Sequence, residues 1–108
     1  MPRQDRLYGT LDALILKALS FGPRHGYAVA RWLEETTRDA LVIEDGSLYP
    51  ALYRLEKRQW IEADWGMTEL GRKARFYRLT QLGRGQLRIE TREWTAFASA
   101  VSLVLSTA

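Results

Sequence analysis

The side chains of this sequence that could take part in chemistry are mostly cations and phenols, which suit binding rather than catalysis. His25 is the single histidine, no cysteine is present, and no carboxylates stand at the spacing of an acid–base pair or a metal site. Without thiolates, a cysteine-based zinc site is also excluded. The sequence therefore predicts no catalytic residue, no metal and no cofactor, and we do not expect an enzyme. His25, beside Gly26, is expected to cap a helix or to fix a turn.

One group of candidate binding residues falls on a single predicted helix. Apolar residues recur at helical spacing over residues 47–58, which predicts a helix with one buried face. Pro50 would lie in its first turn, where a missing backbone N–H costs nothing. The polar and aromatic residues left for binding are Ser47, Tyr49, Tyr53, Arg54 and Lys57. The fork of Arg54 could bind guanine O6 and N7 together, although Arg54 could instead pair with Glu34 or Glu35.

A second group of cations lies between two predicted strands. Residues 60–65 and 75–80 have strand character, and the glycine-bounded loop 66–74 joins them into a hairpin. Arg72, Lys73 and Arg75 cluster there with only Glu69 as a local acidic partner. Contact with DNA phosphate is the preferred interpretation, and a plain surface hairpin is the alternative.

Charge is distributed unevenly along the chain. The net charge is only +3, but residues 67–108 carry seven cationic side chains against three acidic ones. Such a local excess is typical of a patch that faces a polyanion, although a solvated basic face would have the same composition.

The elements that must position these groups are mostly helical. Thr10 is expected to cap a helix over residues 11–20, and a second helix is expected over residues 26–37 with Tyr27, Ala30 and Leu33 facing inward. Residues 41–43 are predicted to form a short strand or an extended connector. The resulting order predicts a mainly α fold with a small antiparallel β-hairpin, which is the arrangement of a winged helix-turn-helix.

A long last helix is expected after Thr80, from residue 81 to about residue 105. Heptad spacing places Leu87, Trp94 and Val101 at one core position, and Phe97 and Val104 at the other. The helix would be about 37 Å long, more than so small a core can cover, so a homodimer is expected. We therefore divide the chain into a DNA-binding domain, 1–80, and a dimerisation helix, 81–108.

The sequence lacks the apolar segments that would direct it to a membrane or out of the cell. The first ten residues contain no apolar run typical of a signal peptide, and the apolar tail is too short to span a bilayer. With no cysteine, the sequence predicts a cytoplasmic protein that does not enter a membrane.

Four segments in order resemble the PadR-type transcriptional regulators. They are GTLDALILKAL at 9–19, HGYAVA at 25–30, EDGSLYPALYRLEKRQWIEADW at 44–65 and GRKARFYRLTQLGR at 71–84. The resemblance implies a winged helix with a single C-terminal helix, in a homodimer whose last helix packs against the first and last helices of its partner. It also implies a repressor that is released by small molecules or stress signals, with Ser47, Tyr49 and the wing at DNA and Tyr27 near it.

The resemblance raises a question about the last helix. Some relatives bind flat aromatic drugs between paired tryptophans at the dimer centre, and Trp94 occupies a comparable place. Trp94 and Phe97 could therefore hold a small aromatic effector, or they could simply fill the dimer core, which we favour.

These observations predict a sequence-specific DNA-binding regulator. The helix at residues 47–58 would enter the major groove, and the wing would contact the backbone or minor groove. A dimer would read a pseudo-palindromic operator on double-stranded DNA. The alternative is a winged helix used only for protein contacts, because the same scaffold serves both purposes.

Overall fold

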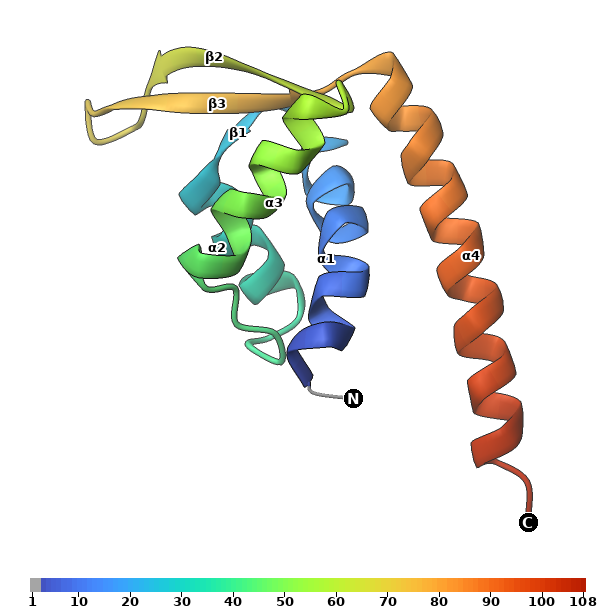
Figure 1. The fold of residues 1–108 in the computed structure, drawn as a ribbon. Helices are drawn as coiled ribbons and strands as arrows, with labels where there is room; N and C mark the ends of the chain where they lie inside the picture. The colour runs from blue at the N-terminus through green and yellow to red at the C-terminus, as the bar shows by residue number, and fades with distance from the viewer. Residues whose placement is uncertain (1–2) are drawn as a thin grey trace.

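The computed structural model describes the backbone of residues 3–108 and the side chains of residues 10–108. The elements in chain order are α1 (Arg3–Leu19), β1 (Arg24–His25), α2 (Gly26–Thr36), α3 (Asp45–Lys57), β2 (Ile61–Met67), β3 (Lys73–Leu79) and α4 (Gln81–Leu105). The first three helices lie under a small sheet, and the long α4 descends beside them (Figure 1). This confirms the predicted fold, mainly α with an antiparallel hairpin.

An aliphatic core holds the first three helices together. Leu11, Ile15 and Leu16 of α1 are fully buried, as are Leu48 and Leu55 of α3. Each such side chain contributes about 1.5–3 kcal/mol by leaving water. Because buried residues fall on two sides of α1, this helix lies at the centre of the bundle, as its sequence predicted.

The sheet has the order β1-β3-β2, and all its pairs are antiparallel. The hairpin of β2 and β3 is longer than predicted, because Gly66 pairs with Ala74 inside it rather than opening the loop. A Cβ on Gly66 of β2 would lie 2.8 Å from the ring of Phe76 on β3, so this glycine permits close packing between the two strands. The turn is short: the Thr68 N–H donates to the Arg72 carbonyl (2.8 Å), and Gly71 supplies a positive φ of 75°.

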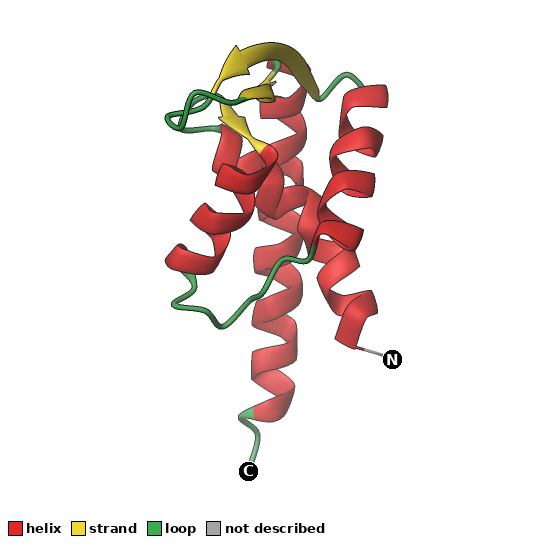
Figure 2. Cartoon of the chain, turned by 90° about the vertical axis from the view of Figure 1, so that its left-hand side faces the viewer, coloured by secondary structure: helices red, strands yellow, loops and turns green. Residues whose placement is uncertain are grey.

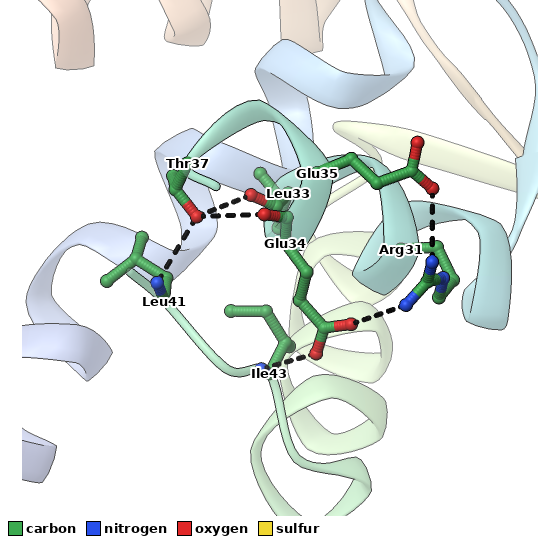
Figure 3. Close-up of polar contacts among 7 residues, drawn as sticks. All are labelled: Arg31, Leu33, Glu34, Glu35, Thr37, Leu41 and Ile43. Carbon is green, nitrogen blue, oxygen red and sulfur yellow. Dashed lines mark hydrogen bonds and ion pairs between the residues drawn. The ribbon is translucent and has the colours of Figure 1, made fainter. Parts of the chain in front are cut away.

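The connector over residues 41–43 forms no strand. Side chains of α2 and its C-cap hold it instead: Thr37 Oγ1 accepts from the Leu41 N–H (3.2 Å), and a Glu34 carboxylate oxygen accepts from the Ile43 N–H (3.1 Å) (Figure 3). Ile43 is buried, so its apolar character serves the core. The third strand is β1, which sequence reasoning assigned to a helix start.

Two helix starts also differ from expectation. α1 begins at Arg3, so Thr10 lies inside the helix and is not its N-cap. α3 begins at Asp45, so Pro50 lies in the second turn, where it removes one backbone hydrogen bond.

The start of α4 is fixed firmly to the sheet. Thr80 Oγ1 accepts from the Gly83 N–H (3.0 Å) and donates to the Gln59 carbonyl (2.7 Å), which confirms Thr80 as the predicted N-cap. Leu87 still packs against the core, but the rest of the helix projects away from it (Figure 2). This projection gives the molecule its length of 56 Å. None of the helices in the described part of the chain combines the length and apolar character of a membrane span.

Candidate nucleic-acid interface

A groove lies between the hairpin and the first turns of α2, with Tyr49 contributed by α3. We call it the wing groove. The charged residues that line it are Arg24, Arg31, Arg72, Lys73 and Arg75 against Glu35 and Glu69. The groove is therefore basic, and phosphate is the ligand that such a lining attracts. Among the residues predicted to bind DNA, it brings together Tyr27, Tyr49, Arg72, Lys73 and Arg75.

The exposed face of α3 adjoins this groove. The buried residues of α3 are Leu48, Ala51, Leu52 and Leu55. Since successive residues are turned by 100°, this buried face determines where the other side chains of α3 lie around the helix. Tyr53 and Lys57 lie at the centre of the exposed face. Tyr49 and Glu56 lie along the edge toward the wing, and Ser47 and Arg54 along the edge toward α1.

Tyr53 and Lys57 are open to solvent and lie against each other. The Lys57 ammonium lies 5.3 Å from the centre of the Tyr53 ring, and Tyr53 is 62% exposed. Tyr49 is more constrained, because a Cβ on Gly26 of α2 would approach its Cε1 to 2.9 Å. Gly26 thus allows Tyr49 to lie against α2.

Arg54 is held at the α1 edge by an ion pair. Its Nη2 donates to Asp12 Oδ1 at 2.9 Å, and both side chains are partly buried. The alternative pairing of Arg54 with Glu34 or Glu35 is wrong, because Arg31 pairs with both at 3.7 and 3.5 Å (Figure 3). This bond holds the Arg54 guanidinium toward α1, so Asp12 would compete with a base for it.

Arg75 joins the wing to α3. Its Nη2 donates to Glu56 Oε2 at 2.7 Å, so Arg75 has an acidic partner outside the hairpin in addition to the local Glu69 that the sequence offered. The Arg75 guanidinium also lies 5.8 Å from the centre of the Tyr77 ring. Burial raises the pKa of Tyr77; Arg75 lowers it, and Glu56 and Tyr49 raise it further.

The other two wing cations, Arg72 and Lys73, have fewer contacts with groups of this chain. Arg72 is exposed beside the turn, and the Lys73 ammonium lies 5.3 Å from the centre of the Trp65 ring. Neither of them forms an ion pair with a carboxylate among residues 10–108, and Lys57 does not either. No carboxylate among these residues therefore offsets the charge of these three cations.

The start of α2 forms the far wall of the groove. His25 Nδ1 accepts from the Ala28 N–H at 3.2 Å, which confirms the predicted cap. Tyr27 is 66% exposed beside it, so the expectation that Tyr27 faces inward is wrong. Gly26, Val29, Ala30 and Leu33 face the core instead, and Tyr27 is left on the groove side.

Among the groove residues that sequence reasoning missed are Trp65, Arg24 and Arg31. Trp65 is 65% exposed although its strand alternates as if buried. The cations on the paired strand were a signal for its place, because residues opposite each other share a face. Arg24 and Arg31 carried no comparable signal, since their positions depend on how β1 and α2 dock.

Trp94 and Phe97 lie on the projecting part of α4, outside the groove. Their ring centroids are 6.1 Å apart, and both side chains are more than half exposed. No group of histidines and carboxylates suited to a metal ion occurs among the described residues.

Comparisons with known proteins give a consistent result. A family model described as "Transcriptional regulator PadR-like family" matches residues 15–89. An uncharacterized protein X from Lysinibacillus sphaericus is 32% identical over 105 residues, which are 97% of this chain and 96% of that protein.

Solved structures agree with the sequence comparisons. A transcriptional regulator from Clostridium thermocellum superposes with a TM-score of 0.83 at 28% identity, covering 91% of this chain and 95% of that one. A PadR-like transcriptional regulator from Bacillus cereus gives a TM-score of 0.82 at 28% identity, covering 96% and 99% of the two chains.

Proposed function

Because the chain belongs to the PadR-like family of transcriptional regulators, and so is a DNA-binding regulator rather than an enzyme, we propose that it represses genes as a homodimer on a pseudo-palindromic operator. In each subunit α3 lies in the major groove, and the wing follows the flanking backbone or minor groove. The observation that carries this proposal is the basic wing groove beside the exposed face of α3.

The residues divide by their surroundings into base-reading and phosphate-binding groups. Tyr53 and Lys57 occupy the centre of the exposed α3 face and point away from the core, so they meet base edges first. Ser47 and Tyr49, near the start of α3, bind phosphate or base edges through their hydroxyl groups. Arg54 is a base-reading residue only if DNA displaces Asp12.

The wing and α2 supply affinity that does not depend on sequence. Arg72 and Lys73 bind phosphates. On the other wall of the wing groove, the Tyr27 hydroxyl donates a hydrogen bond to the DNA backbone. Arg75 contacts phosphate in the orientation that its ion pair with Glu56 holds.

Dimerisation is assigned to residues 81–108, and DNA binding to residues 1–80. The support is the apolar surface of α4, where Trp94, Phe97 and Val104 are exposed with nothing of the same chain to cover them among the described residues. In the dimer, Trp94 and Phe97 fill the core, and a flat aromatic effector would have to enter between them.

The protein represses a gene by occupying its operator. A dimer on promoter DNA excludes the polymerase, and a small molecule or stress signal that separates the α4 helices would release the DNA. The protein acts in the cytoplasm, where bacterial DNA lies.

Selection of bound duplexes from random DNA, followed by salt titration, tests the function. We expect an enriched site with two half-sites about one helical turn, about 34 Å, apart. Replacing Arg72 and Lys73 with alanine should weaken binding to all sequences and flatten the salt slope by up to about two units.

A matched control removes two cations elsewhere. Arg84 and Arg88 of α4 do not line the wing groove, so their replacement with alanine should leave the slope nearly unchanged. Equal slopes for the two double variants would contradict the placement of the wing at phosphate.

A further inference from the structure

One face of the hairpin continues beyond the core that it covers. Strand alternation places Ile61, Ala63, Trp65 and Met67 on one face of β2. At the base of the hairpin this face is closed, because Ile61 and its partner Leu79 are buried. Toward the tip the same face is open: Trp65 is 65% exposed and Met67 is 64% exposed.

The residues opposite Trp65 and Met67 on this open face are cations. Trp65 pairs with Arg75 and Met67 pairs with Lys73, and cross-strand partners share a face of the sheet. The Lys73 ammonium lies 5.3 Å from the centre of the Trp65 ring, and the Arg75 guanidinium is held by Glu56 at 2.7 Å. The open face therefore carries an indole together with two cations, Arg75 as its cross-strand partner and Lys73 near its ring, and it lines the wing groove.

The chemistry of this face limits what can cover it. An exposed indole favours an apolar or ring-shaped partner, while Lys73 and Arg75 on the same face favour a partner that also carries negative charge. A second copy of the hairpin would bring the same two cations against them and be repelled. The sugar–phosphate backbone of DNA meets both requirements, since apolar sugar edges alternate with phosphates along each strand.

We propose that Trp65, with Met67 beside it, packs against deoxyribose of the DNA backbone while Lys73 and Arg75 bind the phosphates on either side. This inference rests on the proposed function, because it assumes that the wing groove receives DNA. Trp65 then contributes affinity through apolar contact, which depends neither on base sequence nor on release of counterions.

Two properties distinguish this role from others. A base-reading residue affects some sequences more than others, and a phosphate-binding cation changes the salt slope. Trp65→Ala should weaken binding of a random-sequence duplex and of a selected site by the same factor, about tenfold, and leave the salt slope unchanged. Trp65→Phe should retain most of the affinity, because the ring remains.

A direct readout uses the native chain labelled with 5-fluorotryptophan. The four tryptophan resonances are observed by fluorine NMR, and the one that disappears in Trp65→Phe is assigned to Trp65. We expect this resonance to shift when a random-sequence duplex is added, whereas that of Trp60, at the base of the hairpin, stays in place. This measurement also decides the matter if Trp65→Ala fails to fold.

The outcomes separate this inference from the proposed function. If the native chain binds duplex DNA but the Trp65 resonance does not move, or if Trp65→Ala binds like the native chain, the inference is overturned and the function stands. A flatter salt slope for Trp65→Ala would also overturn it, because Trp65 would then act only by placing Lys73. A native chain that binds no duplex overturns both.

Discussion

Two arginines at the proposed interface are already bound to carboxylates of the same chain. Arg54 is held by Asp12 at one edge of α3, and Arg75 is held by Glu56 at the other. Partly exposed ion pairs contribute at most about 1 kcal/mol to stability, so their main effect is on geometry. They fix the edges of α3 against α1 and the wing, and they reduce the positive charge that any DNA encounters.

The Glu56–Arg75 pair can be tested by removing one charge. In Glu56→Gln, Arg75 no longer divides its charge between a carboxylate and phosphate, and a carboxylate that repels DNA is gone. We therefore expect tighter binding to random-sequence duplex and a steeper salt slope, measured by salt titration. Glu62→Gln is the control, since Glu62 pairs with Arg78 on the opposite face of the hairpin and its loss changes the net charge equally. If both variants bind alike, Glu56 does not restrain Arg75 at the interface.

Tyr77 makes stability depend on alkaline pH. Its pKa lies above the ordinary value of 10.0, chiefly because burial disfavours the phenolate. The folded chain therefore holds this proton more tightly than the unfolded chain. The corresponding stability is complete below about pH 10 and is lost as the pH rises through the folded pKa.

Replacement of Tyr77 with phenylalanine should remove this contribution. The free energy of unfolding, measured by urea titration at several pH values, should fall less steeply above about pH 10 for Tyr77→Phe than for the native chain. The other tyrosines titrate in both proteins, so the difference reports Tyr77. Identical curves would show that Tyr77 is not buried as described.

The types of the candidate residues could be predicted from the sequence, but their partners could not. Helical spacing placed Tyr49, Tyr53 and Lys57 on the exposed face of α3, because the apolar positions define the opposite face. Nothing local predicts the Arg54–Asp12 bond, whose members lie 42 positions apart and meet only when α1 packs against α3. Trp65 was missed because alternation indicates a face and not where the core ends.

Among the elements, those whose apolar residues recur with a clear helical period were predicted well. The period of α4 and its Thr80 cap gave both ends of the helix to within a residue or two. β1 was missed, since two residues form a strand only because β3 lies beside them. Of the two alternatives for residues 41–43, a strand or an extended connector, the structure has the connector, and Ile43 is buried in the core.

The attachment of α4 depends on a glycine. A Cβ on Gly83 would lie 2.0 Å from the carbonyl oxygen of Trp60, which is backbone and cannot yield easily. We expect Gly83→Ala to lower the free energy of unfolding by about 3 kcal/mol, measured by urea denaturation. The matched control is Gly85→Ala in the same helix, where the nearest neighbour is the Arg88 side chain at 3.8 Å. This variant should gain about 0.5–1 kcal/mol from helix propensity, and a loss similar to that of Gly83→Ala would show that α4 is not docked through Gly83.

Across the whole molecule, two structures extend beyond the core that anchors them. The core-facing side of the hairpin continues beyond the core and is there exposed to the proposed DNA. The second half of α4 likewise extends beyond the core, in another direction. Gly83 and Leu87 of α4 face the core, and the same stripe continues as Trp94, Phe97 and Val101, which no side chain of residues 10–108 covers. A single subunit therefore leaves two open surfaces, one for the proposed DNA and one for the proposed second subunit.

The α4 stripe can be tested by placing charge on it. Phe97→Glu together with Val101→Glu should give a monomer, since two carboxylates would be buried against the partner helix without counterions. Sedimentation equilibrium measures the association, and Ser99→Glu, on the opposite side of α4, should leave the dimer intact. Because a dimer binds two half-sites at once, we expect the monomer to lose about a hundredfold or more in operator affinity while still binding DNA weakly through one wing and one α3. A variant that stays dimeric would place the interface elsewhere. A monomer with native operator affinity would show that the two α3 helices do not act together on one duplex.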